Sequence, residues 1–88
     1  MNSANKKKLR AEAHTLNPVV MIGQSGLTSA VLAEIELALD SHELIKVKIR
    51  AEREERKLIS EKICADSGAE LIQAIGQIAV IYRLNQDK

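Results

Sequence analysis

The sequence is poor in residues that many binding and catalytic chemistries need. Of its 88 residues, one is aromatic, Tyr82, and one is a cysteine, Cys64. A single ring excludes a surface that stacks bases on several aromatic side chains. A single cysteine excludes an internal disulfide and multi-cysteine metal sites, and it fits a reducing compartment. No apolar run approaches the roughly 18 residues of a membrane span. We therefore expect a cytoplasmic protein that makes no membrane contact.

Patterns for catalysis and metal binding are also missing. His14 and His42 have no acidic partner or further metal ligand at a recognisable spacing. Ser25 and Ser29 lack the context of a nucleophile elbow. The glycine-rich segment 23–26 has neither the Lys-Ser/Thr of a P-loop nor the third glycine of a dinucleotide fingerprint. The sequence predicts no enzymatic activity, no metal site and no cofactor.

Hydrophobic periodicity predicts the element order αβαβαββ. The helices are expected at 3–15, 28–41 and 52–67, and the strands at 19–22, 43–50, 71–75 and 78–84. The inward side of the last helix is expected to comprise Leu58, Ile59, Ile63 and Ala65. Strands separated by helices favour parallel neighbours, while Gly76-Gln77 suits a tight type II′ hairpin turn. We expect one domain over residues 1–88, of the α/β (α+β two-layer) class, with a four-stranded mixed sheet and helices mainly on one face.

The strand expected at 43–50 alternates most cleanly. One side of this strand is expected to carry Ile45, Val47 and Ile49, and the other side is expected to carry Lys46, Lys48 and Arg50. Burying the basic side under helices would be costly, so we expect an open, basic sheet face. Arg83 joins this face if Ile78, Val80 and Tyr82 point into the core. The same pattern fits a solvated strand on which lysines block aggregation.

Charge is unevenly distributed although the net charge is +1. Residues 1–26 hold four bases and one acid, residues 27–45 hold four acids and no base, and residues 46–57 hold six bases and three acids. The first block contains Lys6, Lys7, Lys8 and Arg10. Basic clusters of this kind are an electrostatic footprint for phosphates. Arg53, Arg56 and Lys57 stand beside Glu52, Glu54 and Glu55, so we interpret them as a salt-bridged helix face.

The segment Gly23-Gln24-Ser25-Gly26 separates an expected strand from an expected helix, for which Thr28 is the N-cap. Glycines let a backbone approach a ligand closely, and a helix N-terminus offers unpaired N–H groups to an anion. A tight turn needs the same two glycines. The loop is also suited to clamp a nucleic-acid backbone, as the GXXG loop of KH domains does.

Four segments together resemble one known family: residues 16–28, 31–36, 42–49 and 76–83. Their order and spacing resemble the CRM domain, specifically its stand-alone bacterial form, the YhbY family, over about Lys8 to Arg83. The resemblance implies a KH-like RNA-binding protein with a fold similar to the C-terminal domain of translation initiation factor three. It implies no catalysis. The implied partner is structured RNA, specifically ribosomal RNA in precursors of the large subunit, bound by an assembly factor.

The residues expected to contact RNA combine the loop, the first helix and the basic strand face. They are Gly23, Gln24, Ser25, Gly26, Thr28, Lys6, Lys7, Lys8, Arg10, Lys46, Lys48, Arg50 and Arg83. Many relatives carry a base between the two glycines, whereas Gln24 and Ser25 are neutral, so the loop would supply geometry and its surroundings the charge. Nothing in the sequence demands more than a monomer. The alternative is an adaptor that contacts a basic ribosomal protein through Glu34, Glu36 and Asp40, while duplex DNA binding lacks a recognition helix.

Overall fold

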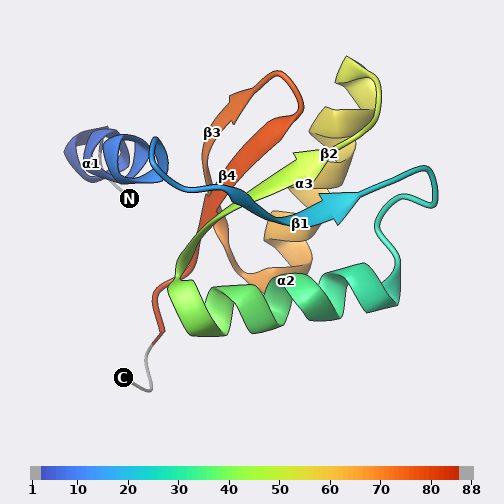
Figure 1. Ribbon diagram of the computed structural model, residues 1–88, viewed down its shortest axis with the longest axis horizontal. Coiled ribbons are helices and arrows are strands. Elements are labelled where there is room, and N and C mark those ends of the chain that lie inside the picture. Colours follow the sequence, from blue (N-terminus) through green and yellow to red (C-terminus); the bar gives the residue numbers. More distant parts are fainter. Residues whose placement is uncertain (1–2, 86–88) are drawn as a thin grey trace.

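The computed structural model describes residues 3–85, and its elements follow the predicted order (Figure 1). They are α1 (Ser3–Ala13), β1 (Pro18–Ile22), α2 (Ser29–His42), β2 (Leu44–Ile49), α3 (Arg53–Ser67), β3 (Glu70–Ile75) and β4 (Ile78–Tyr82). Thr28 caps α2 as expected, with its hydroxyl oxygen accepting from the Val31 N–H at 3.2 Å. Gly68 ends α3 in the left-handed region at φ +74°, where a residue without a Cβ meets no steric penalty.

The four strands form one mixed sheet, as predicted, and the structure gives the strand order as β1-β2-β4-β3. β1 runs parallel to β2, and β4 runs antiparallel to both β2 and β3. The carboxyl ends of β1 and β2 therefore lie beside the β3–β4 turn. Figure 1 shows these connections at the end of the sheet away from α1. We call this the loop end, comprising residues 23–28, 50–52 and 76–77.

Two of the three helices, α2 and α3, cover one face of the sheet, which confirms the two-layer architecture. The buried side chains between these layers are aliphatic: Val20, Ile22, Ile35, Leu39, Ile45, Val47, Ile49, Ile59, Ile63, Ala69, Ala79 and Ile81. Each large aliphatic side chain buried here contributes about 1.5–3 kcal/mol. This core fixes the positions of both ends of the β1–α2 loop.

The inward face of α3 differs from the prediction at Leu58 and Ala65, which are both exposed, Leu58 at 65%. The helix instead buries Ser60 and Ser67 beside its isoleucines. Ser60 Oγ donates to the Lys57 carbonyl at 3.0 Å, and Ser67 Oγ donates to the Ile63 carbonyl at 2.6 Å. Because both hydroxyls are satisfied within the helix, their burial carries little penalty.

The expectation of an entirely open second face is wrong, because α1 packs against it and contacts β2 and β3. The buried cluster on this face is Ala13, Leu44, Ile72 and Val80, with Leu9, Ile78 and Tyr82 packed around it. Ile78, Val80 and Tyr82 thus face α1, whereas Ala79 and Ile81 face α2 and α3. Every residue of β4 is apolar or aromatic, so alternation alone could not assign its two faces.

Candidate nucleic-acid interface

The β1–α2 loop is a tight turn whose two glycines differ in backbone conformation. The Gly26 N–H donates to the Gly23 carbonyl at 3.0 Å and closes the turn. Gly26 adopts φ +72°, a conformation that side chains of L residues disfavour. Gly23 has an ordinary φ, and a Cβ placed there would meet no atom within 4 Å. Of the two, Gly26 alone therefore has a conformational reason to be glycine, and the space beside both positions is open.

The loop leads directly into the N-terminus of α2. Thr28 supplies the cap, and its carbonyl accepts from the Leu32 N–H at 2.9 Å. Because the Thr28 hydroxyl oxygen already accepts from Val31, its hydrogen remains available to donate. The first turn of a helix carries unpaired N–H groups and a partial positive charge. Together with the exposed Gln24 and Ser25, this geometry suits a phosphate group.

One row of side chains crosses the whole sheet at the loop end, on the face opposite α2 and α3. In register it runs from Met21 to Lys48, Ile78 and Ile75, with one residue from each strand. Met21 is 55% exposed and Ile75 is 63% exposed. Nothing among residues 3–85 forms an ion pair with Lys48. Within this row, Lys48 is therefore a charge without an ion-pair partner among residues 3–85, and its neighbours are apolar.

Some of the basic residues of α1 and β2 lie close together, and others lie apart. Lys46 donates from Nζ to the Leu16 carbonyl at 3.0 Å and holds the α1–β1 connection against the sheet. A cavity of about 160 Å³ between α1 and the sheet is lined by Lys46, Arg10 and His14, among others. The structure thus brings Arg10 to Lys46, while Lys6, Lys7 and Lys8 lie on the earlier turns of α1. Lys7 and Lys8 are exposed and Lys6 is half-buried.

Arg50 follows β2 at the loop end and is exposed. Its backbone N–H donates to the Ile22 carbonyl at 2.9 Å. Because Ile22 immediately precedes Gly23, this hydrogen bond places Arg50 beside the start of the β1–α2 loop.

Arg83 does not lie with Lys46 and Lys48, so its expected placement on the basic face is wrong. Nη1 donates to Glu36 Oε2 at 2.6 Å and to the Ser67 carbonyl at 2.8 Å, and Nη2 donates to Asp40 Oδ1 at 2.8 Å. The hydrogen bond to Glu36 raises the pKa of Arg83 above its ordinary value. Arg83 joins α2 to the ends of α3 and β4. Arg83 thus forms ion pairs with Glu36 and Asp40, which are two of the three acids of the alternative adaptor surface.

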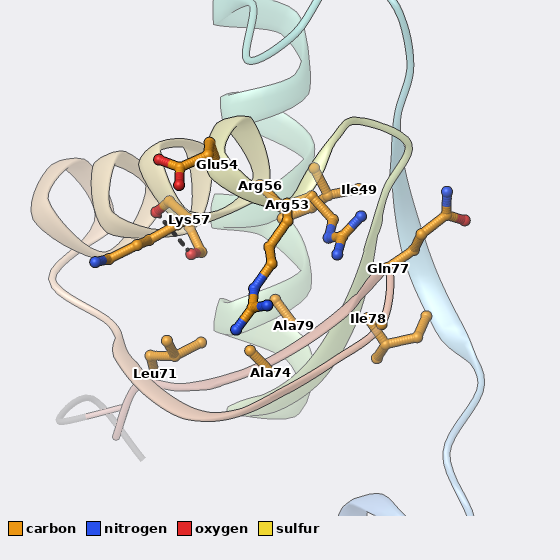
Figure 2. A pocket seen from close by; sticks show the side chains of 12 residues that line it. Ile49, Arg53, Glu54, Arg56, Lys57, Leu71, Ala74, Gln77, Ile78 and Ala79 are labelled. Carbon is orange, nitrogen blue, oxygen red and sulfur yellow. Dashed lines mark hydrogen bonds between the residues drawn. The ribbon is translucent and has the colours of Figure 1, made fainter.

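A groove between the first turns of α3 and the β3–β4 hairpin was not expected from the sequence (Figure 2). Its volume is about 740 Å³, and its lining comprises Ile49, Arg53, Glu54, Arg56, Lys57, Ser60, Leu71, Ala74, Gly76, Gln77, Ile78 and Ala79. Within the described residues, no ion pair joins Arg53, Arg56 or Lys57 to a glutamate. Their interpretation as a salt-bridged helix face is therefore wrong. The spacing i, i+3, i+4, which puts the three bases on one helix face, is the signal that could have located them.

Three further observations on residues 3–85 concern metal ligands, membrane-spanning helices and the single thiol. Between residues 3 and 85, no three His, Cys, Asp or Glu side chains form a group able to hold a metal ion. No helix in that range is long and apolar enough to cross a membrane. Burial raises the pKa of the Cys64 thiol above its ordinary value of 9.0, and the nearby Glu70 carboxylate raises it further. The thiol is thus kept protonated at neutral pH.

Comparison with known proteins shows a family match that covers almost the whole chain and not only the individual motifs. The model of the CRS1/YhbY (CRM) domain matches residues 1–83. The chain belongs to the CRS1/YhbY (CRM) domain family. This CRM domain is 44% identical to a Pseudomonas aeruginosa protein named as a probable RNA-binding protein, over 97% of this chain and 83% of that protein. It is 49% identical to an RNA-binding protein of Haemophilus influenzae, over 99% of this chain and 89% of that protein.

The CRM domain also matches a solved fold. The solution structure of a candidate RNA-binding protein from Staphylococcus aureus aligns with a TM-score of 0.86 and 31% identity, over 98% of this chain and 91% of that one. The family resemblance inferred from the sequence is confirmed.

Two backbone hydrogen bonds join the connections at the loop end of this CRM domain. Besides the bond between Arg50 and Ile22, the Ile49 N–H donates to the Gln77 carbonyl at 2.7 Å. The GXXG loop, the β2–α3 connection and the hairpin turn are therefore contiguous. This continuity places Arg50 between the loop and the α3 groove.

Proposed function

We propose that this CRM domain is a non-enzymatic RNA-binding protein that docks on precursors of the large ribosomal subunit as an assembly factor. We propose further that residues 1–88 act as one monomeric domain in the cytoplasm. The observation that carries the proposal is the junction of the GXXG loop, the N-terminus of α2, Lys48 and Arg50 at one end of the sheet. RNA binding also agrees with the names of the relatives from P. aeruginosa and H. influenzae.

The proposed contact is with the backbone of structured RNA. The open space over Gly23 admits a phosphate to the loop, where N–H groups of the α2 start and the Thr28 hydroxyl donate to it. Lys48 and Arg50 supply charge beside the loop, and Arg10 and Lys46 extend it toward α1. Contacts to phosphate fix position and orientation without reading base sequence. Shape recognition of this kind suits a surface without an aromatic platform.

Filter binding to protein-free large-subunit ribosomal RNA tests this surface. We combine Gln24→Glu, which places an acid in the exposed loop, with Lys48→Gln, which removes an unpaired base. Lys46 is left intact because it holds the Leu16 carbonyl. The matched control combines Ser41→Glu with Lys62→Gln, which makes the same charge change at exposed positions away from the loop end.

We expect the test pair to weaken binding about tenfold, equivalent to about 1.4 kcal/mol, and the control to bind as the wild type does. Circular dichroism verifies that each variant is folded. Equal affinity of the test pair and the wild type would refute the assignment of the surface.

The ribosomal part of the proposal has a separate test. A lysate containing tagged protein is sedimented through a sucrose gradient with and without ribonuclease. We expect the protein to migrate with the large subunit or its lighter precursors and to be released by ribonuclease. Protein that stays at the top of the gradient in low salt would exclude the assembly-factor role while leaving binding to another RNA possible. A complex that survives ribonuclease would favour the adaptor alternative.

A further inference from the structure

The groove beside α3 is lined by the bases of residues 52–57 and by only one of the acids of that segment. Arg53, Arg56 and Lys57 line the groove, and Glu54 is the one acid on its walls. The bases at i, i+3 and i+4 share a helix face, while Glu52 and Glu55 lie outside the lining. The result is a concave surface with excess positive charge, although residues 52–57 contain three acids and three bases.

The side chains of the three bases differ in burial and in their hydrogen bonds to the described residues. Arg56 is half-buried, and its Nη1 donates to the Ala51 carbonyl at 2.8 Å, which holds its guanidinium in place. Arg53 and Lys57 are exposed and make no side-chain hydrogen bond or ion pair with residues 3–85. Figure 2 shows the two arginine side chains between α3 and the hairpin. One guanidinium is thus held in place, and two exposed cations are available to a ligand.

The opposite side of the groove is apolar. Leu71, Ala74 and Ala79 come from the hairpin, and Ile49 comes from the end of β2. The volume of about 740 Å³ lies within the roughly 300–1,000 Å³ of small-ligand sites. Such a groove accommodates a nucleotide and its neighbouring phosphates, but it is too small for an A-form duplex. Unpaired nucleotides can stack on arginine guanidinium planes where aromatic rings are missing.

We propose that this groove is a second RNA site, which holds an unpaired nucleotide of the RNA strand that leaves the GXXG loop. This inference rests on the proposed function, because the strand reaches the groove past Arg50 and the Gly76-Gln77 turn. Arg53 and Lys57 bind its phosphates, the Arg56 guanidinium stacks on its base, and the apolar wall contacts the ribose. The loop recognises structured RNA, and the groove selects RNA with an unpaired nucleotide next to that structure.

The first test measures the salt dependence of binding to protein-free large-subunit ribosomal RNA. Arg53→Gln and Lys57→Gln are compared singly with Lys62→Gln, which removes one exposed charge from the same helix outside the groove. Losing one phosphate contact lowers the salt slope by about 0.7–0.9. The ratio of affinities at 50 and 200 mM salt should then fall about threefold for each groove variant and stay unchanged for Lys62→Gln. Groove variants that behave like the Lys62 variant would overturn the proposal.

The second test locates the RNA directly, using the single cysteine. In a Cys64→Ala background, Gln77→Cys and Ser41→Cys are each labelled with a photoreactive azidophenyl group and irradiated with the same RNA. We expect a crosslink from position 77, on the groove, and none from the exposed position 41 at the far end of α2. Equal yields at both positions, or none at position 77, would contradict the groove site.

The outcomes separate the two proposals. If the Gln24 and Lys48 pair weakens binding while the groove variants and the position 77 probe show nothing, the groove site falls and the proposed function stands. If the wild type does not bind the RNA at 50 mM salt, both fall. Loss in the Gln24 and Lys48 pair and in both groove variants, with unchanged controls and a crosslink at position 77, supports a continuous path from the loop into the groove.

Discussion

Replacing Arg83 by methionine should destabilise the fold without removing an RNA contact. Arg83 lies at the end of β4 with a side chain only 20% exposed, and it donates to Glu36, Asp40 and the Ser67 carbonyl. Methionine retains an apolar stem of similar length and removes the charge and the donors. The three acceptors then lose their common partner.

The magnitude follows from the exposure of each acceptor. Hydrogen bonds to charged groups contribute about 1.5–3 kcal/mol when shielded, whereas exposed ion pairs contribute about 0–1 kcal/mol. The Asp40 side chain is 66% exposed and belongs to the second class, while Glu36 at 39% is only partly shielded. Ser67 is buried, so its carbonyl loses a charged donor with little water to replace it. We expect the free energy of unfolding to fall by about 2–3 kcal/mol.

Urea denaturation followed by circular dichroism measures the change, with Arg50→Met as the control. Arg50 is exposed and, within residues 3–85, its side chain forms no ion pair. Its replacement should change the free energy of unfolding by no more than about 0.5 kcal/mol. For a domain of this size the Arg83 variant should melt roughly 8–24 °C lower. A loss below about 0.5 kcal/mol, or an RNA affinity that falls while stability is kept, would refute a structural role for Arg83.

Three further perturbations test the packing, the thiol and the loop. Ile63→Ala should cost about 2–5 kcal/mol in urea denaturation because Ile63 is fully buried, whereas Leu58→Ala should stay within about 0.5 kcal/mol; equal costs would contradict the observed face of α3. Because the fold raises the pKa of Cys64 above 9.0, the folded state favours the protonated thiol and stability falls as pH rises past that value. The wild type should therefore lose more stability than Cys64→Ala between pH 8 and pH 10. Equal losses in the two proteins would contradict a raised pKa of Cys64 in the folded state. Gly26→Ala should cost about 1–2 kcal/mol because of its positive φ, and Gly26→Asn should cost less; the reverse order of melting temperatures would exclude backbone strain as the cause.

Local patterns in the sequence predicted the elements and much of the site. The alternation of apolar and basic residues in β2 placed Ile45 and Val47 in the core and Lys48 on the other face, as the structure has them. Thr28 as an N-cap depended only on its neighbours, because capping is a local hydrogen bond. The contiguous GXXG segment was likewise visible as a motif. These features were predictable because each is determined within a few residues along the chain.

The remaining features depended on which residues meet across the sheet. β4 is apolar throughout, so only its register with β2 assigns Val80 to the α1 face and Ala79 to the other. That assignment carries Arg83 to α2 and away from Lys46. The α3 bases form a groove because the β3–β4 hairpin stands opposite them.

Local propensity and contiguous motifs are sufficient to give the order of helices and strands, the capped loop and the family. Three features become visible only in the folded chain: α1 covers part of the second sheet face, Arg83 joins α2 to β4, and Arg50 connects the loop to a basic groove. They could not be predicted because a uniformly apolar strand and a mixed-charge helix have no unique orientation until strand register and packing are established.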